Sequence, residues 1–199
     1  MPVSVRASVR VAVRQEGGML ELHGPDTALA IELGRGGSYS LSHDDPQWLD
    51  ELACALEDHA WVVPPDGGLL SGLSVGANLA LALSDGVHAA TAQDAALQEA
   101  LLAAGMPPEK LAQLHRCMPS DLNPLELWTV AWAMALLRQP ACLVLDHPMT
   151  HLNHAQQHAV LGMVALFQDR HPTCPVLWLN LKPSLSPDLV PSREAACLC

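Results

Sequence analysis

The chain has 199 residues, half of them hydrophobic but only 4% aromatic, and a formal net charge of −11 at pH 7. This length suits one domain with a single sizeable core, and the apolar content, carried by Ala, Leu and Val, excludes a disordered chain. Because proteins contact phosphates through Lys and Arg, the acidic balance argues against nucleic acid as a partner.

The first half of the chain predicts several strands and one helix. Alternating apolar and polar residues predict strands over 3–13, 19–22 and 28–33, with a further strand at 39–41. Pro46 is tolerated in a first helical turn, and apolar residues recur at helical spacing from Trp48 to Leu56, which predicts a helix. The apolar run 61–63 is stopped by two prolines, so we expect a strand that enters a Gly-rich loop.

The second half alternates helices with apolar strands. Helical spacing predicts helices over 79–83, 94–104, 108–114, 124–137 and 151–170. Continuous apolar runs predict strands at 141–145, which ends in Asp146, and at 176–179. This alternation is typical of an α/β sheet with buried parallel strands. Ligands of such sheets bind at the carboxyl ends of the strands, which is where we search for chemistry.

Neither a membrane span nor a leader peptide is expected. The longest apolar runs, 69–83 and 130–137, are interrupted or are shorter than a span of about 20 residues. The N-terminal segment lacks the continuous apolar core of a signal peptide, so we expect a cytoplasmic protein. Six scattered cysteines lack the spacing of a zinc site or of a disulfide framework, and we expect most of them to be buried.

Two blocks of sequence resemble the ATP-binding-cassette (ABC) ATPases. The stretch 118–148 is similar to the ABC signature, its helix and the Walker B strand, without a gap, and 67–79 resembles the segment that follows the family's Q-loop. Together, 67–79 and 118–122 are most similar to the ATPase of Mla-type phospholipid transporters. The resemblance implies an α/β, P-loop NTPase-like ABC nucleotide-binding domain: a mixed sheet with flanking helices and a small helical lobe.

The domain boundaries follow from the same resemblance. We expect a single domain over 1–199, in which 1–83 and 135–199 form the α/β core and 84–134 form the helical lobe. The break at 105–108, which is rich in Gly and Pro, falls inside that lobe.

The phosphate loop of the family, GxxxxGK[ST], is degenerate here. Its glycines cradle phosphates, its Lys binds the β- and γ-phosphates, and its hydroxyl binds Mg²⁺. The corresponding segment, 42–52, contains His43 and Pro46 but no glycine, with Leu49 in place of the Lys and Asp50 in place of the hydroxyl residue. Acidic residues at 44, 45 and 50 would face a bound phosphate, so the electrostatics are reversed.

The remaining nucleotide-site positions implied by the resemblance are also replaced, except one. Asp146 ends its strand as the Walker B Asp does, but His147 stands where the catalytic Glu is expected. Pro65 takes the Q-loop position, Asn153 that of the D-loop Asp and Asn180 that of the switch His. The signature LSGGQ becomes Leu122 followed by Asn123, Pro124, Leu125 and Glu126.

Two polar sets outside the motifs admit alternative interpretations. His151, His154 and His158 share one helix face near His147 and Asp146, which suggests a metal site. Pro148 interrupts that geometry and no further ligand completes the set, so we expect a polar stripe facing solvent or a partner, and no metal. Similarly, His43 with the two following Asp residues could form a hydrolytic or metal cluster, but capping of the next helix is the favoured explanation.

The sequence therefore favours a protein that is not an enzyme: a pseudo-ATPase subunit of an ABC transporter that binds neither ATP nor Mg²⁺. It would dock on a membrane permease at the inner face of a bacterial plasma membrane, beside a catalytic ABC ATPase or a second copy, with lipid as the suggested cargo. Candidate interface residues are Leu79, Leu83, Trp128 and Trp132, although core packing is the favoured explanation of the two tryptophans.

Two other functions stay open. The chain could be a soluble regulatory or binding module on a decayed ABC fold. It could also be an atypical ATPase, in which case a change at Asp146 would abolish turnover of Mg-ATP.

Overall fold

The computed structural model describes residues 14–16, 19–23, 30–43, 45–83, 90–150 and 152–181. The predicted strand at 3–13 lies outside these residues. The chain divides into two compact units. The first contains the described residues up to Val62, then Ala141–His147 and those from Pro172 onward; the second contains Val63–Pro140 and Pro148–His171. The predicted boundaries of core and lobe stay a prediction.

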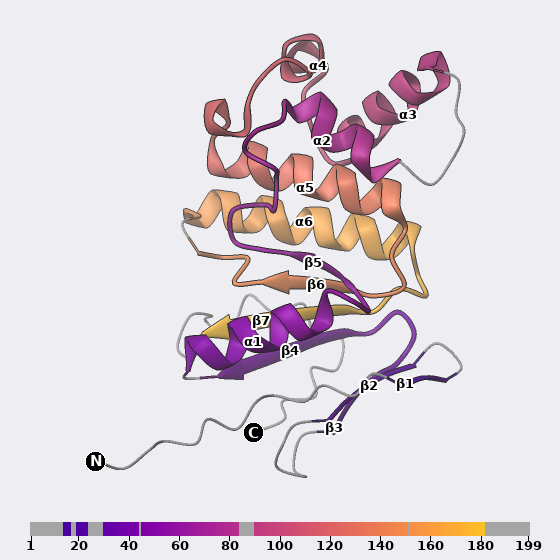
Figure 1. Ribbon diagram of the computed structural model, residues 1–199, viewed down its shortest axis with the longest axis vertical. Helices are drawn as coiled ribbons and strands as arrows, with labels where there is room; N and C mark the ends of the chain where they lie inside the picture. The colour runs from indigo at the N-terminus through magenta and orange to yellow at the C-terminus, as the bar shows by residue number, and fades with distance from the viewer. Residues whose placement is uncertain are drawn as a thin grey trace. The chain divides into compact units, whose positions relative to one another are not determined.

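A parallel sheet organises the first unit (Figure 1). Its strands are β4 (Ser38–His43), β5 (Trp61–Val63), β6 (Leu143–Asp146) and β7 (Val176–Leu181), in the order β4-β7-β6-β5. β7 pairs in parallel with β4 and with β6. Every residue of β6 is buried, as expected for a strand covered on both faces.

The antiparallel strands of this unit form a sheet of their own rather than extending the first sheet into a mixed one. They are β1 (Arg14–Glu16), β2 (Met19–His23) and β3 (Ala30–Leu33), paired in chain order. The predicted strands at 19–22 and 28–33 are thereby confirmed to within two residues.

Helix α1 (Pro46–Leu56) packs on β4, β6 and β7. Its buried residues recur at helical spacing and pack with side chains of the three strands in one core. Leu49, at the position of the family's Lys, is fully buried in this core. The helix predicted to begin at Pro46 is therefore confirmed, and its apolar face packs against the sheet.

Helices make up most of the second unit (Figure 1). They are α2 (Val75–Ala82), α3 (Ala90–Ala103), α4 (Pro108–Leu114), a 3₁₀ turn η1 (Pro119–Asp121), α5 (Pro124–Arg138) and α6 (His154–Arg170). Helix α5 is central, with contacts to α2, α3 and α6. Among the described residues, no helix combines the length and the apolarity needed to span a membrane.

Side-chain capping explains where two helices differ from their predicted start. Helix α2 begins four residues before the predicted position because the Ser74 hydroxyl accepts a hydrogen bond from the N–H of Ala77 at 3.2 Å. Helix α6 begins three residues later than predicted because Asn153 caps it. The 3₁₀ turn η1 was not predicted.

Three of the four candidate interface residues are buried in the core, which corrects the interface interpretation of Leu79 and confirms core packing of the two tryptophans. Leu79 is 0% exposed, and Trp128 and Trp132 are each 1% exposed. The Trp132 ring packs edge-on against Phe167 of α6, with ring centroids 5.5 Å apart. Because α2, α3 and α6 all contact α5, its tryptophans hold the unit together instead of facing a partner. Leu83 is half-buried.

Neighbouring positions of α6 provide a matched test of this core. Phe167 is 0% exposed and Leu166 is 52% exposed. We expect Phe167→Ala to lower the free energy of unfolding by about 3–5 kcal/mol, because it removes a buried ring. Leu166→Ala should change it by less than about 0.5 kcal/mol. Denaturant unfolding followed by tryptophan fluorescence compares the two, and equal losses would contradict the assigned burial.

Candidate functional site

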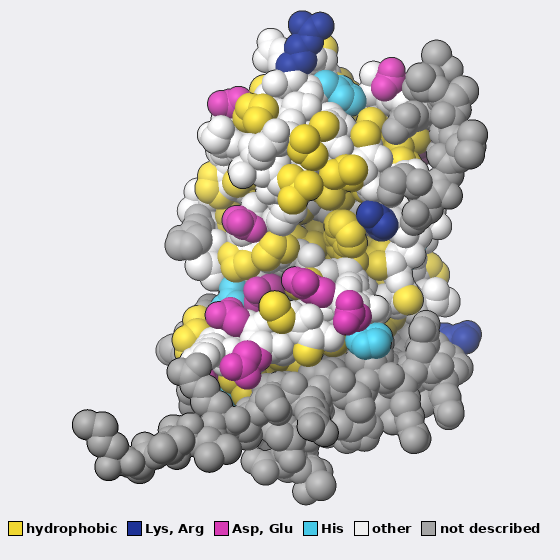
Figure 2. Space-filling model, viewed as in Figure 1, with side chains coloured by type: hydrophobic (Ala, Val, Ile, Leu, Met, Phe, Trp, Pro, Cys, Tyr) yellow, Lys and Arg dark blue, Asp and Glu magenta, His cyan; other side chains and the backbone are white. Residues whose placement is uncertain are grey.

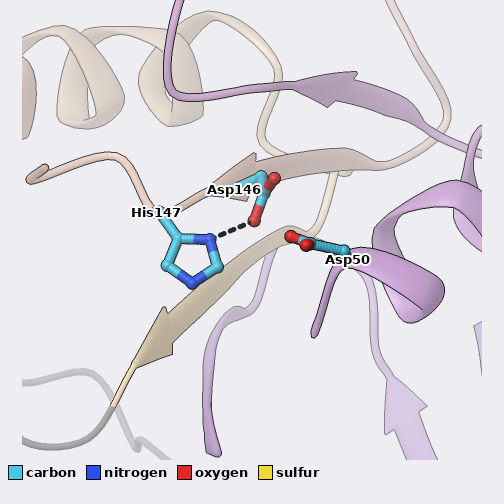
Figure 3. Close-up of side chains that lie close together, drawn as sticks. All are labelled: Asp50, Asp146 and His147. Atoms are coloured by element: carbon cyan, nitrogen blue, oxygen red, sulfur yellow. Dashed lines mark hydrogen bonds and ion pairs between the residues drawn. The ribbon is translucent and has the colours of Figure 1, made fainter. Parts of the chain in front are cut away.

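Three polar side chains meet at the carboxyl end of β6, within the first unit (Figure 3). Asp146 is the last residue of β6, His147 follows it, and Asp50 comes from α1. One potential ligand atom from each residue lies within 4.8 Å of those of the other two. This is the position at which parallel α/β sheets bind their ligands.

The side chains of Asp146 and His147 form a buried pair. The Nδ1 atom of His147 lies 2.5 Å from Oδ1 of Asp146, and each side chain is about nine-tenths buried. The other ring nitrogen, Nε2, is buried and has no hydrogen-bond partner among the described residues. An unpaired buried polar atom costs about 1–3 kcal/mol.

The backbone conformation of His147 also costs free energy. Its φ of 47° lies in the left-handed region, which a residue with a side chain adopts at about 1–3 kcal/mol. The conformation is held because the N–H of His147 donates to the carbonyl of Leu179 on β7 at 3.0 Å, one step beyond the end of β6. The sheet therefore fixes the strained residue at the site.

The local electrostatics disfavour negative charge on Asp146. Burial raises the pKa of the Asp146 carboxyl group, and the negative charge of Asp50 raises it further. The hydrogen bond and charge of His147 act in the opposite direction. The carboxylate of Asp50 is exposed to solvent, whereas Asp146 and His147 are buried.

The start of α1 is closed by its own residues. Only positions 44 and 45 separate β4 from α1. The Asp45 carboxylate accepts from the N–H of Gln47 at 2.9 Å, and Pro46 fills the first turn. The His43 ring stacks on Trp48 at 4.4 Å, and its Nδ1 accepts from the N–H of Asp45 at 3.0 Å. The predicted capping role is confirmed for Asp45, whereas Asp44 lies outside the described residues.

Asn180, at the position of the switch His, is buried and contributes to packing within the sheet. It is 3% exposed, and its Nδ2 donates to the Ser40 hydroxyl of β4 at 3.2 Å. Ser40 lies on the strand that is paired with β7. The amide is thereby satisfied inside the sheet.

In the second unit, two of the predicted site residues are helix caps. Asn123 exchanges hydrogen bonds with Glu126, each backbone N–H donating to the other side chain at 3.0 Å. Asn153 and Gln156 form the same reciprocal box at the start of α6. The sequence carries the signal for both, an Asn followed three residues later by Glu or Gln, and the motif comparison overlooked it.

The other predicted positions of this unit are half-buried or lie at its surface. Pro124 is exposed in the first turn of α5, and Leu125 and Pro65 are half-buried. Glu126 also forms an ion pair with Lys110 of α4, and the hydrogen bond from Lys110 lowers the pKa of the Glu126 carboxyl group.

The predicted histidine stripe is partly described. His154 and His158 are exposed on α6, as expected, with their rings 4.5 Å apart. His151 lies outside the described residues. The approach of Asp50 to the end of β6 was not predicted, because it depends on how α1 is rotated against the sheet.

No protein-family model and no curated protein sequence matches the chain, whereas solved structures do. The dimeric bacterial ABC transporter cassette MJ0796 matches with a TM-score of 0.61 at 15% identity, over 86% of this chain and 85% of that one. The cbiO1 protein of Clostridium perfringens, part of the cbiONQ transporter complex, matches with a TM-score of 0.57 at 16% identity, over 76% and 70%. The predicted fold class, an ABC nucleotide-binding domain, is confirmed; at these identities the likeness shows the fold alone.

The raised pKa of Asp146 predicts a pH-dependent stability. Because folding disfavours the charged carboxylate, stability is lost as pH rises through the folded-state pKa. Asn at this position keeps an acceptor oxygen for His147 without the charge. Asp146→Asn should be more stable than the wild type at pH 7, and this advantage should shrink as pH falls through the raised pKa of Asp146 and vanish below about 3.9, the pKa of an unfolded Asp. Denaturant unfolding across this range measures it; a pH-independent loss of stability would contradict the assignment.

Proposed function

We propose that the chain is a non-catalytic, ABC-type subunit that docks on a membrane permease and supports transport without binding or hydrolysing ATP. The observation that carries the proposal is the start of α1, at the position of the family's phosphate loop. Only two residues connect β4 to α1 there, and the Asp45 carboxylate accepts a hydrogen bond from the N–H of Gln47.

A phosphate loop binds anions through free backbone N–H groups at a helix N-terminus and through a Lys side chain. In this chain an acidic side chain already caps that N-terminus. Leu49, in place of the Lys, is fully buried in the core and offers no charge. A phosphate group would have to displace a carboxylate and would gain no cation in return.

The charge around α1 also opposes a nucleotide. Figure 2 shows acidic side chains gathered over α1, where Asp50, Glu51, Glu57 and Asp58 are exposed. The sequence has no Lys or Arg between Arg35 and Lys110 to offset them. Two like charges 4 Å apart repel by about 1 kcal/mol in water and by about 4 kcal/mol near a protein surface. These repulsions add to the missing contacts.

The segment at the family's signature supports the same conclusion for a partner's nucleotide. Asn123 and Glu126 satisfy one another's backbone N–H groups at the start of α5. Glu126 also forms an ion pair with Lys110. These groups stabilise the helix and occupy two of the N–H groups that a partner's phosphate would need.

Two structural relatives support a role in a transporter. MJ0796 forms a dimeric cassette and cbiO1 is part of a transporter complex. By analogy with them, the partners proposed here are a permease and either a catalytic ABC ATPase or a second copy. The location is then the cytoplasmic face of a bacterial plasma membrane. The similarity to Mla-type ATPases makes phospholipid the first cargo to test.

Exposed leucines of the second unit are suited to docking. Leu70 is 55% exposed, Leu81 43% and Leu102 46%, and Figure 2 shows hydrophobic side chains gathered over this unit. They take the place of the buried residues that the sequence suggested for an interface.

Affinity purification of the tagged chain from solubilised native membranes tests the proposal. We expect recovery of an ABC permease together with a second ATPase that has an intact GxxxxGK[ST]. Leu102→Glu should reduce that recovery, because a buried charge weakens an apolar contact. The matched control is Leu166→Glu on α6, which alters a leucine of the same unit with similar exposure, 52% against 46%, that is not among the three assigned to docking, and it should leave recovery unchanged. Recovery of soluble proteins alone would favour the regulatory module.

Nucleotide assays on the purified chain form a separate test. We expect no saturable binding of Mg-ATP at millimolar concentrations and no phosphate release above the buffer blank, in the wild type and in Asp146→Asn alike. Turnover that is present in the wild type and lost in Asp146→Asn would instead identify an atypical ATPase.

A further inference from the structure

We propose that Leu70 is the anchor through which the chain binds a basic cytoplasmic loop of the permease, and that Asn78 is the positioning residue that holds Leu70 in place. The inference rests on the proposed function and deepens it, because it names the residue that fixes the docking surface and the charge of the partner. Its basis is geometric: a buried side chain holds the backbone of an exposed leucine.

The side-chain amide of Asn78, on α2, is hydrogen-bonded to both backbone groups of Leu70. Its Oδ1 accepts from the N–H of Leu70 at 2.7 Å, and its Nδ2 donates to the carbonyl of Leu70 at 3.1 Å. The same Nδ2 lies 3.2 Å from the carbonyl of Leu73 and 3.1 Å from that of Ser74. Because Asn78 is only 1% exposed, water does not compete for these hydrogen bonds. One side chain therefore fixes residues 70–74, which we call the docking turn.

Backbone and capping hydrogen bonds stabilise the docking turn further. The N–H of Leu73 donates to the carbonyl of Leu70 at 3.1 Å, which closes the turn on itself. Ser74 ends the turn and caps α2, since its hydroxyl accepts from the N–H of Ala77 at 3.2 Å. The turn is thus attached to a helix of its own unit at both of its ends.

The side chain of Leu70, in contrast to its backbone, is exposed. It is 55% exposed, more than any other large hydrophobic side chain in the part of the chain that the structure describes. A partner that covers it removes apolar surface from water. Because Asn78 already holds the turn in one conformation, binding does not have to order a loop, which improves affinity. These properties distinguish an interface anchor from an exposed leucine without a role.

The charge of the chain indicates the chemistry of the partner. The sequence has no Lys or Arg between Arg35 and Lys110. In the second unit, exposed carboxylates accompany the exposed leucines: Asp66 precedes the docking turn, and Glu99 lies one helical turn before Leu102 on α3. Cytoplasmic loops of membrane proteins carry an excess of Lys and Arg. Such a loop is attracted to this surface, whereas a second copy with a net charge of −11 is repelled.

Gly72 provides a position at which to test this charge. It is exposed in the docking turn, its φ lies outside the left-handed region, and a Cβ there would have no heavy atom within 4 Å. Gly72→Lys and Gly72→Glu are therefore both compatible with the fold, and they differ in the sign of a charge two residues from Leu70. We expect the Lys variant to recover less permease than the Glu variant, because it repels a basic loop. Equal recovery by the two would overturn the assignment of a basic partner.

Affinity purification of the tagged chain from solubilised native membranes tests the two roles, with the permease recovered per tagged chain as the readout. Leu70→Ala and Asn78→Ala should each reduce recovery by more than roughly fivefold. Ser74→Ala is the matched control: it removes the cap of the same helix but leaves the hydrogen bonds between Asn78 and Leu70 in place, and it should retain recovery. Loss of stability alone would affect the control as well.

Hydrogen exchange of the isolated chain separates positioning from a general structural role. In Asn78→Ala the amide of Leu70 should exchange more than roughly tenfold faster, while amides of α5 and α6 keep their protection. Unchanged protection of Leu70 would overturn the role of Asn78. Recovery of the permease by the wild type and equally by Leu70→Ala would overturn the anchor and leave the proposed function standing. Failure of the wild type to recover any permease would overturn the proposed function and, with it, the partner named here.

Discussion

The parallel pairing of β6 with β7 determines where the polar groups of the first unit lie. It sets Asp146 opposite Leu179, and Leu179 in turn anchors the backbone of His147. On the other edge of β7, the register places Ser42 opposite Asn180. Because β6 is buried at every residue, this register cannot slip without moving apolar side chains out of the core. The position of Asp146 and His147 is therefore set by the packing of apolar side chains around β6.

Helix N-termini show how the chain uses the positions at which the ABC family binds phosphates. Asp45, Asn123 and Asn153 each cap the helix that follows, and each lies at or beside a position implied by the family resemblance. A cap contributes about 0.5–2 kcal/mol to stability. A nucleotide site needs the opposite arrangement, with N–H groups left free for the ligand. In this chain the capped N–H groups stabilise the fold, which supports the proposed loss of nucleotide binding.

Local pattern predicted the elements well and their three-dimensional contacts poorly. The helix starting at Pro46 and the helix over 108–114 follow from spacing and proline placement, and the buried run 141–145 gives β6. In α5, however, Trp128–Ala135 are buried without interruption, so periodicity indicated no solvent face and left the tryptophans ambiguous. Likewise, the meeting of Asp50 with Asp146 depends on the rotation of α1, which no local signal encodes.

Several energetically unfavourable features of the fold fall on Asp146 and His147, although Gln139 also has a left-handed backbone. A left-handed backbone, an unpaired ring nitrogen and a carboxyl group whose pKa is raised by burial all fall on two adjacent residues. Elsewhere, several replaced nucleotide-site positions serve as caps or core, among them Asn123, Asn153 and Leu49. Loss of function alone gives no reason for strain to collect at one point, whereas ligand sites commonly hold such strain.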